Sequence, residues 1–441
     1  MKVKKAIIVP NCNDYNRGDQ ALVWQAASLI RDVLGCDEIA IISSSSSSAS
    51  NQQSIKHGLN VITGILKNPR RFKENEDYIK ESKITILRLV GNSLIDFVHS
   101  YMLYVLARHK KICKKILSSE QYATYTEFLN TDLIVVKGGG FIHSYGEFRA
   151  VYYIWYQMYY LYLAKKLGKK VIILPNSFGP LKGPFIIRYL VKKILSKCEF
   201  VSARENISKQ FMSDLLSKKV DCYPDMAYTL PGASKENGNV ICNRYKIPVN
   251  EKVCVGLTLR PYRFSGNNNT NELYRKYICS FAELARHIDK NGMHPVFIAH
   301  VTGPNKHEDD RIALKKVINN LTTINYSYVD VVGDCLDIKD LYCCMDYLVG
   351  TRFHSVIFSQ SEIVPSIAVS YGGNKGTGIM MDIGFQEYTI GIDKVNATEI
   401  CKMFDNMINN SEIIKIRLKE WMQNVEQKKC DMYKAIKESL H

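Results

Sequence analysis

Residues 346–360 read DYLVGTRFHSVIFSQ, and this stretch decides how the chain is expected to fold. Residues 347–349 are typical of a short buried strand, Gly350 allows a turn, and a run with helical spacing begins at Ser355. Parallel strands cannot be joined by a tight hairpin and need a crossover, which is usually a helix. The stretch therefore predicts the strand–turn–helix unit of an α/β fold.

The same unit recurs in two series along the chain. In the first half, apolar runs typical of buried strands lie at 6–9, 39–42, 133–136, 171–174 and 200–202. In the second half, they lie at 253–257, 296–299, 328–331, 347–349 and 366–369. Two such series predict an α/β protein with two Rossmann-like, doubly wound domains that face a cleft, in a GT-B-like arrangement.

A turn-rich, polar segment separates the two series and is the natural junction between them. It spans residues 231–238, so we expect an N-terminal Rossmann-like domain over 1–238 on the acceptor side. A C-terminal Rossmann-like domain over 239–395 is expected on the donor side. The remaining residues, 396–441, are predicted to form helices that pack back on the N-terminal domain.

Residues 60–130 do not follow the alternation and are predicted to form a basic helical insert. Between residues 67 and 115 there are twelve Lys and Arg but only five Asp and Glu, and apolar residues from Leu94 to Val105 follow helical spacing. One interpretation is a hairpin that packs on the first domain. The other is a basic amphipathic face that docks on an anionic membrane or a lipid-linked substrate. Asp96 interrupts the nearest candidate for a membrane span, so we do not expect this segment to cross a bilayer.

Composition limits the class of protein and of partner. The 441 residues are 46% hydrophobic, which excludes a wholly disordered or collagen-like chain. The formal net charge of +16 suggests an anionic partner, namely nucleic acid, an acidic lipid surface or a phosphorylated substrate. No nucleic-acid-binding motif is present, so nucleic acid is not expected. The 13 cysteines are scattered without a CxxC pair, which favours a reducing, cytoplasmic location.

Arg352 and His354 are the first candidates for chemistry, because both lie in the turn between a strand and a helix. Open α/β sheets bind ligands at the carboxyl ends of their strands, and the free N–H groups of the following helix attract anions. A guanidinium suits a carboxylate or phosphate, and an imidazole can move a proton near neutral pH. The alternatives are a structural ion pair for Arg352 and a satisfied surface histidine for His354.

Two further cations follow predicted strands of the second domain. Lys375 lies among four glycines between residues 372 and 378, and Arg260 follows the strand at 253–257. Glycines let the backbone approach an anion, although a flexible turn with a solvated lysine is the alternative. No carboxylate cluster interleaves with these cations in the sequence, so no metal site is expected.

The first domain offers three more turns that follow strands. Asp19 opens a helix and is interpreted either as a capping residue or as a base. Gly138, Gly139 and Gly140 follow the strand at 133–136 but lack the GxGxxG spacing, so NAD binding is not favoured. Arg204 follows the strand at 200–202 and can form an internal ion pair with Glu205 instead of binding a ligand.

Taken in order, these residues resemble the polysaccharide pyruvyl transferase family. The resemblance spans residues 5–395 except the insert at 60–130, and departs from any familiar pattern there. The motifs that carry it are Asn16–Asp19, Gly138–Gly140, Ser177–Pro180, Ser202–Ser208, Pro224-Asp225, Gly350–Ser355 and the set Pro365, Tyr371 and Lys375.

The resemblance implies an enzyme that moves pyruvate from phosphoenolpyruvate to a sugar of a cell-surface polysaccharide, as a ketal. It implies a saccharide acceptor, with a lipid-linked precursor left open, and a site at the inner face of the membrane. Phosphoenolpyruvate is then a co-substrate, and neither a cofactor nor a metal is expected. The resemblance implies that Arg352, His354 and Lys375 match positions tied to donor binding and catalysis, and that Arg260 and Arg204 match arginines of the family. The chemistry of ketal formation then predicts His354 as the acid, Asp19 as a base on the acceptor side, and all four cations as donor-binding residues. The turn of Gly138, Gly139 and Gly140 is expected to form acceptor-side loops.

Two rival functions stay open at this point. A GT-B glycosyltransferase that uses a nucleotide sugar would also need cations beside a cleft, because its donor carries a pyrophosphate. Such an enzyme usually carries a carboxylate for the ribose hydroxyls, and Glu362 is the only nearby candidate. A non-catalytic polyanion binder is suggested by the net charge alone.

Overall fold

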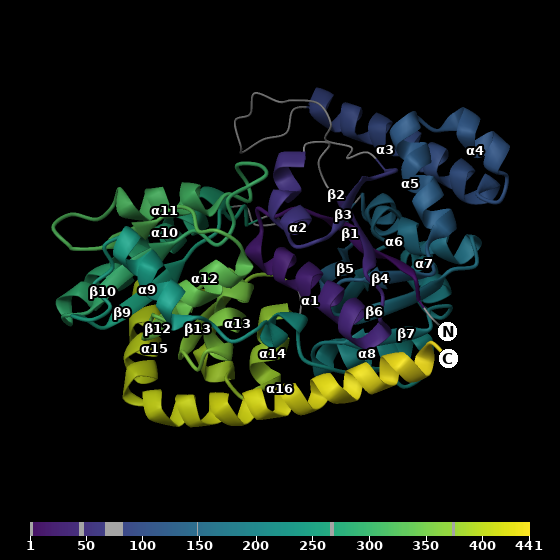
Figure 1. Ribbon diagram of the computed structural model, residues 1–441. Helices are drawn as coiled ribbons and strands as arrows, with labels where there is room; N and C mark the ends of the chain where they lie inside the picture. Colours follow the sequence, from purple (N-terminus) through teal and green to yellow (C-terminus); the bar gives the residue numbers. More distant parts are fainter. Residues whose placement is uncertain (1–2, 44–47, 67–82, 148, 265–268, 373–374) are drawn as a thin grey trace.

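The computed structural model describes residues 3–43, 48–66, 83–147, 149–264, 269–372 and 375–441. Two parallel sheets form the two halves of the molecule, and helices cover them (Figure 1). The predicted α/β class with two Rossmann-like units is therefore confirmed.

The first sheet has the strand order β3-β2-β1-β4-β6-β7-β8, and β5 pairs with β6 outside this path. Its strands are β1 (Lys5–Cys12), β2 (Glu38–Ser43), β3 (Asn60–Thr63), β4 (Leu133–Val136), β5 (Gly139–Tyr145), β6 (Lys170–Lys182), β7 (Phe200–Ala203) and β8 (Asp221–Cys222). The central strand β1 pairs in parallel with β2 and β4, and its residues 6–9 are almost fully buried because both faces are covered.

The second sheet has the order β11-β10-β9-β12-β13-β14, and β12 lies at its centre between β9 and β13. Its strands are β9 (Cys254–Thr258), β10 (His294–Ile298), β11 (Ser327–Val329), β12 (Tyr347–Gly350), β13 (Ser366–Ser370) and β14 (Thr389–Gly391). All five pairings are parallel. The apolar runs predicted for the second half therefore correspond to five strands of this sheet.

The helices follow the strands as crossovers or cover the ends of the sheets. In the first half they are α1 (Arg17–Leu34), α2 (Gln52–Lys56), α3 (Lys83–Leu106), α4 (Lys110–Ile116), α5 (Ser119–Asn130), α6 (Ala150–Lys166), α7 (Phe185–Leu195) and α8 (Asn206–Leu216), with the 3-10 turn η2 (Met226–Thr229). In the second half they are α9 (Lys235–Arg244), α10 (Thr270–Lys290), α11 (Asp310–Ile318), α12 (Cys335–Tyr342), α13 (Phe353–Ser361), α14 (Lys375–Asp382), α15 (Ala397–Asn409) and α16 (Ser411–Ser439).

The region predicted as a helical insert, 60–130, differs in one respect from the expectation. Its first residues form β3, which pairs with β2 at the edge of the sheet, so the insertion proper consists of α3, α4 and α5. Helix α5 is tied to the end of β3, because Thr124 Oγ1 donates to the Thr63 carbonyl at 2.6 Å. Residues 67–82, which contribute several of the counted charges, lie outside the described part.

The predicted domain boundary after residue 238 falls inside α9. This helix packs on α12, where Asn237 Nδ2 donates to Asp337 Oδ1 at 3.0 Å. The last helix, α16, runs along both halves at the lower edge of the molecule (Figure 1). Its Trp421 ring lies 5.7 Å from Tyr228 of η2, and the Lys170 ammonium of the first sheet donates to the Leu440 carbonyl.

Candidate functional site

The two halves touch where strands of both sheets end. After β1, the Tyr15 carbonyl accepts a hydrogen bond from the Thr302 amide of the second half at 3.0 Å. Arg17 then opens α1, and its Nη2 donates to the Val332 carbonyl at 3.0 Å. Both sheets therefore direct their carboxyl ends, where open α/β sheets bind ligands, toward this junction.

Residues 346–360 form the part of the candidate site that belongs to the second half. Strand β12 ends at Gly350, where a Cβ would lie 2.7 Å from both Ser355 Oγ and Thr258 Oγ1. Only glycine leaves room for the Ser355–Thr258 hydrogen bond, which is itself 2.7 Å long. The helix begins at Phe353, two residues earlier than predicted, so that His354 lies in the first turn of α13.

His354 faces the first half of the molecule. It is buried, with an exposed fraction of 6%, and packs against Gly18 at the start of α1. A Cβ on Gly18 would lie 2.7 Å from His354 Cβ and closer still to the ring. The ring nitrogen Nε2 lies 3.9 Å from Asp225 Oδ2, which is an ion-pair distance and longer than a hydrogen bond.

Asp225 joins His354 to Arg204. Its Oδ2 accepts a hydrogen bond from Arg204 Nη1 at 2.5 Å, and neither side chain is exposed to solvent. Arg204 Nε donates to Ser177 Oγ at 2.8 Å. The remaining nitrogen, Arg204 Nη2, is buried and has no hydrogen-bond partner among the described residues. Buried donors are almost always satisfied, so this nitrogen is available for an acceptor that the protein itself does not supply.

Arg352 caps α13 and turns toward α11. Its Nε donates to Asp310 Oδ1 at 2.8 Å, and its Nη2 donates to the Glu308 carbonyl. Burial raises the pKa of Asp310 to about 6, and the neighbouring Arg352 guanidinium opposes that rise. Burial opposes the charge on Arg352, but the nearby Asp310 carboxylate outweighs it and the pKa of Arg352 is raised. Arg352 thus forms the structural ion pair that was the alternative interpretation.

The other two predicted cations of the second half lie around β9 and β13. The Arg260 guanidinium stacks over the Tyr371 ring, with Cζ 4.1 Å from its centroid. Cation–π stacking of this kind leaves the guanidinium edge able to donate hydrogen bonds. Lys375 is the first residue of α14, but its side chain lies outside the described part of the chain.

On the acceptor side, Asp19 and the three glycines are linked by Lys137. The Lys137 ammonium lies 3.2 Å from Asp19 Oδ1, and the lysine is almost fully buried whereas Asp19 is 40% exposed. Gly138 follows this lysine directly, and Gly139 adopts a φ of +145° that L side chains rarely adopt, because β5 begins there. Gly139 and Gly140 therefore begin a strand, and the proposed acceptor-side role of the three glycines stays a prediction.

Sequence reasoning missed Asp225 and Glu205 as members of the site. Asp225 lies in the Pro224-Asp225 motif, but nothing in the sequence pairs it with residues 21 and 129 positions away. Glu205 receives a hydrogen bond from Ser177 Oγ at 3.1 Å, and burial raises its pKa to about 7. The α14 residue Gly378 packs on it, because a Cβ there would lie 2.5 Å from Glu205 Cγ.

Single carboxylates do contact two of the arginines, since Asp225 accepts a hydrogen bond from Arg204 and Asp310 accepts one from Arg352. The described residues still contain no group of three or more His, Cys, Asp and Glu side chains that could hold a metal ion. The absence of a metal from the reaction stays a prediction.

Comparison with solved structures shows that the fold is that of GT-B enzymes. Anabaena HepE in complex with UDP-glucose matches with a TM-score of 0.56 and 11% identity, over 99% of both chains. Glycyrrhiza uralensis UGT73P12 matches with a TM-score of 0.55 and 11% identity, over 99% of this chain and 96% of that one. S. aureus MnaA with UDP matches with a TM-score of 0.54 and 10% identity, over 94% of this chain and 90% of that one. Identities this low show the fold alone.

Comparison with family models gives a match to polysaccharide pyruvyl transferase that spans residues 16–373. This range begins at the Asn16 cap of α1 and ends just before α14, so it includes Gly18, Arg204, Asp225 and His354. It covers most of the chain and confirms the resemblance that the motifs indicated. The chain belongs to the polysaccharide pyruvyl transferase family.

Proposed function

We propose that this protein transfers the pyruvyl group of phosphoenolpyruvate to a saccharide, forming a cyclic ketal and releasing phosphate. The proposal depends above all on the group formed by His354, Asp225 and Arg204, because a titratable ring and a guanidinium both contact one carboxylate, and the guanidinium has a nitrogen without a partner among the described residues. Phosphoenolpyruvate carries a carboxylate and a phosphate, both of which accept hydrogen bonds from guanidinium groups.

The chemical step begins with protonation of C3 by His354. The electrons of the C2–C3 double bond form the new C–H bond and leave positive charge on C2, which a sugar hydroxyl then attacks. Phosphate leaves with the electrons of its C–O bond, and a second hydroxyl of the same sugar closes the ketal. Asp19 takes the proton of the first hydroxyl and passes it to the departing phosphate, and the proton of the second hydroxyl restores His354. A positioned acid accelerates such a step by roughly 10²–10⁴-fold.

Each cation has a distinct part in this proposal. Arg204 donates from Nη2 to the donor, and Arg260 and Lys375 hold its second anionic group from the turns after β9 and β13. Arg352 acts mainly by fixing the first turn of α13, because Asp310 already neutralises its charge. On the acceptor side, Asp19 is the proposed base, since its carboxylate is the partly exposed member of the pair with Lys137.

The acceptor is proposed to be a sugar of a cell-surface polysaccharide or of its lipid-linked precursor. A lipid-linked acceptor is confined to a membrane, so the enzyme would work at its inner face. No cofactor is part of the proposed reaction.

Phosphate release from phosphoenolpyruvate in the presence of candidate oligosaccharides tests the proposal. His354→Ala should lower turnover by at least ~10²-fold, because the acid is lost. It should leave the calorimetric affinity for phosphoenolpyruvate largely intact. His441→Ala, at an exposed terminal histidine, is the matched control and should change neither value. His354→Ala retaining more than about a tenth of the activity would contradict the assigned acid.

A thermal-shift panel distinguishes the rival glycosyltransferase function. Phosphoenolpyruvate should raise the melting temperature, whereas UDP- and GDP-sugars should not. Stabilisation by a nucleotide sugar alone would overturn the proposed donor.

A further inference from the structure

Helix α3 exposes large apolar side chains along one face. Leu87 is 70% exposed, and Leu94 and Ile95 are each 62% exposed. The spacing of three, four and seven residues places the set in one stripe on the helix surface. The exposed members are Leu87, Leu94, Ile95, Val98, Tyr101, Met102 and Val105. We name these seven residues the α3 stripe.

The opposite face of α3 is firmly packed, so the stripe is not exposed because the helix is loosely held. Leu89, Ser100 and Leu103 are buried on that face. Trp155 of α6 donates from Nε1 to Ser100 Oγ at 2.8 Å, and its ring lies 5.4 Å from Phe97. By length and composition, Leu87–Leu106 could cross a membrane. Because α6 covers the opposite side of the helix, the stripe is the apolar face that lipid could contact among the described residues.

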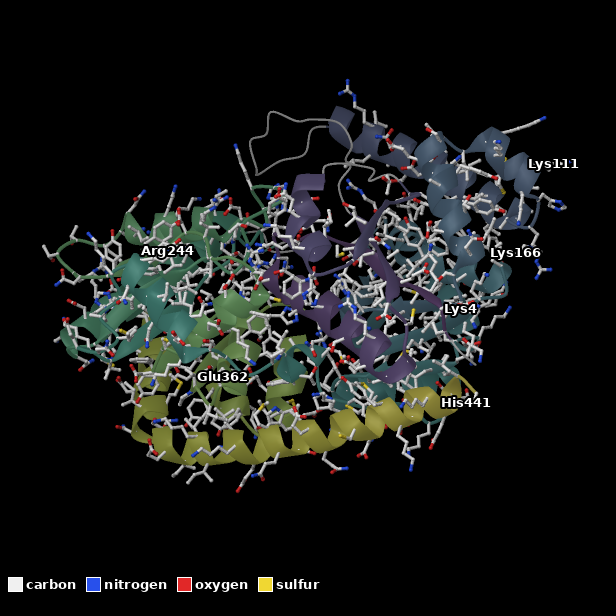
Figure 2. The ribbon with its side chains drawn as sticks, viewed as in Figure 1. Lys4, Lys111, Lys166, Arg244, Glu362 and His441 are labelled. Carbon is white, nitrogen blue, oxygen red and sulfur yellow. The ribbon has the colours of Figure 1, made fainter. Side chains whose placement is uncertain are left out.

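Positively charged residues flank the stripe in the sequence. Between Leu87 and Leu117 the only acidic residue is Asp96, which is buried. The six cations of this segment are all exposed, and they are Arg88, Arg108, Lys110, Lys111, Lys114 and Lys115. Lys111 lies at the outer edge of the molecule (Figure 2), and Lys166 of α6 lies on the same side, 5.5 Å from the Tyr104 ring.

We propose that the α3 stripe and the lysines of α4 dock the protein on an anionic phospholipid bilayer. An apolar helix face flanked by Lys and Arg lies in the interfacial plane, with its apolar side chains among the acyl chains and its cations at the headgroups. A second copy of this chain would instead bring two strongly cationic surfaces together. The inference rests on the proposed function only for its purpose, which is to bring the site to a lipid-linked acceptor.

Vesicle co-sedimentation without any substrate tests the surface. The wild-type protein should bind phosphatidylcholine vesicles that contain phosphatidylglycerol, bind pure phosphatidylcholine far less, and be released by high salt. Changing Lys110, Lys111, Lys114 and Lys115 to Gln should weaken binding at least about 100-fold, because each cation near an anionic surface contributes about 5-fold. Val98→Asn combined with Val105→Asn should weaken it about 10-fold.

The matched control removes the same charge from the other side of the molecule. Lys402, Lys419, Lys434 and Lys437 are exposed on α15 and α16, at the lower edge in Figure 1, and changing them to Gln should leave binding within about threefold. Equal losses in the two lysine variants would overturn the proposal. So would a wild-type dimer that the valine variant dissociates and that binds no vesicles.

The experiment separates this inference from the proposed function. A protein that binds anionic vesicles but never consumes phosphoenolpyruvate would refute the function and leave the surface standing. A protein that consumes phosphoenolpyruvate but does not bind anionic vesicles would refute the membrane-docking surface and leave the proposed function standing.

Discussion

Gly18→Ala tests the site through the contact between α1 and α13. A Cβ on Gly18 would lie 2.7 Å from His354 Cβ and closer still to Nδ1 and Cγ of the ring, so the imidazole has to move. The backbone itself accepts alanine, because Gly18 lies in α1 without a positive φ. Overpacking costs about 1–3 kcal/mol, and alanine returns about 1 kcal/mol of helix propensity. We therefore expect the free energy of unfolding to fall by no more than about 2 kcal/mol.

Activity should respond far more strongly than stability. Displacing a catalytic group by about 1 Å can cost 10²-fold, so Gly18→Ala should lower phosphate release from phosphoenolpyruvate by at least that factor. Urea unfolding and turnover at saturating donor measure the two effects on the same sample. Gly91→Ala is the control, because a Cβ there meets nothing within 4 Å. Gly91→Ala should leave turnover unchanged and raise the free energy of unfolding by about 0.5–1 kcal/mol.

A second background isolates the clash. In His354→Gly, the ring and its Cβ are both gone, so adding Gly18→Ala should no longer destabilise the protein. Two results would refute the reasoning. One is that Gly18→Ala keeps turnover within about threefold of wild type, far from the expected loss. The other is that it destabilises the His354→Gly background as much as it destabilises the wild type.

Three further predictions concern two buried carboxyl groups and the expected absence of a metal. Asp225→Asn leaves the buried Arg204 guanidinium without its counterion and should lower the free energy of unfolding by about 3–5 kcal/mol, and a urea-measured loss below about 1 kcal/mol would contradict the ion pair. Burial raises the pKa of Glu205 from 4.5 to about 7, so the folded state keeps a proton that the unfolded chain loses, and stability falls as pH rises through this window. Glu205→Gln should remove up to about 3 kcal/mol of that fall between pH 4.5 and 8, and an unchanged pH profile of unfolding would refute it. EDTA should leave phosphate release unchanged, whereas a loss that Mg²⁺ restores would require a metal.

The strands that sequence reasoning found are those buried on both faces. β1, β4 and β12 are continuous apolar runs because helices cover both sides of a parallel sheet. The strands it missed lack that signal. β3 is a half-buried edge strand, and β14 has only three residues. β5 (GGFIHSY) alternates with glycines and polar residues and was interpreted as a loop, because glycine is normally depleted in strands.

The site could be predicted only one turn at a time. A polar or glycine-rich segment after each apolar run indicates a turn at the end of a strand, and these turns contain His354, Arg204 and Asp19. The sequence does not show which way a side chain points across the junction between sheets. Asp310, the partner of Arg352, belongs to α11. Asp225 precedes a short 3-10 turn, which is too short to give a periodic hydrophobic pattern in the sequence.

The partners of the two arginines decide which one can attract a donor. Arg352 does not share its carboxylate with another cation. Asp310 contacts no second cationic side chain among the described hydrogen bonds and ion pairs, so its charge is balanced within the pair. Asp225 is instead shared between Arg204 and His354. When the imidazole carries the proton that it is proposed to deliver, this group has two positive charges and one negative charge. The surplus charge would therefore lie on His354, and the unpaired donor among the described residues is Arg204 Nη2, so we expect the anion to bind between these two side chains rather than at Arg352.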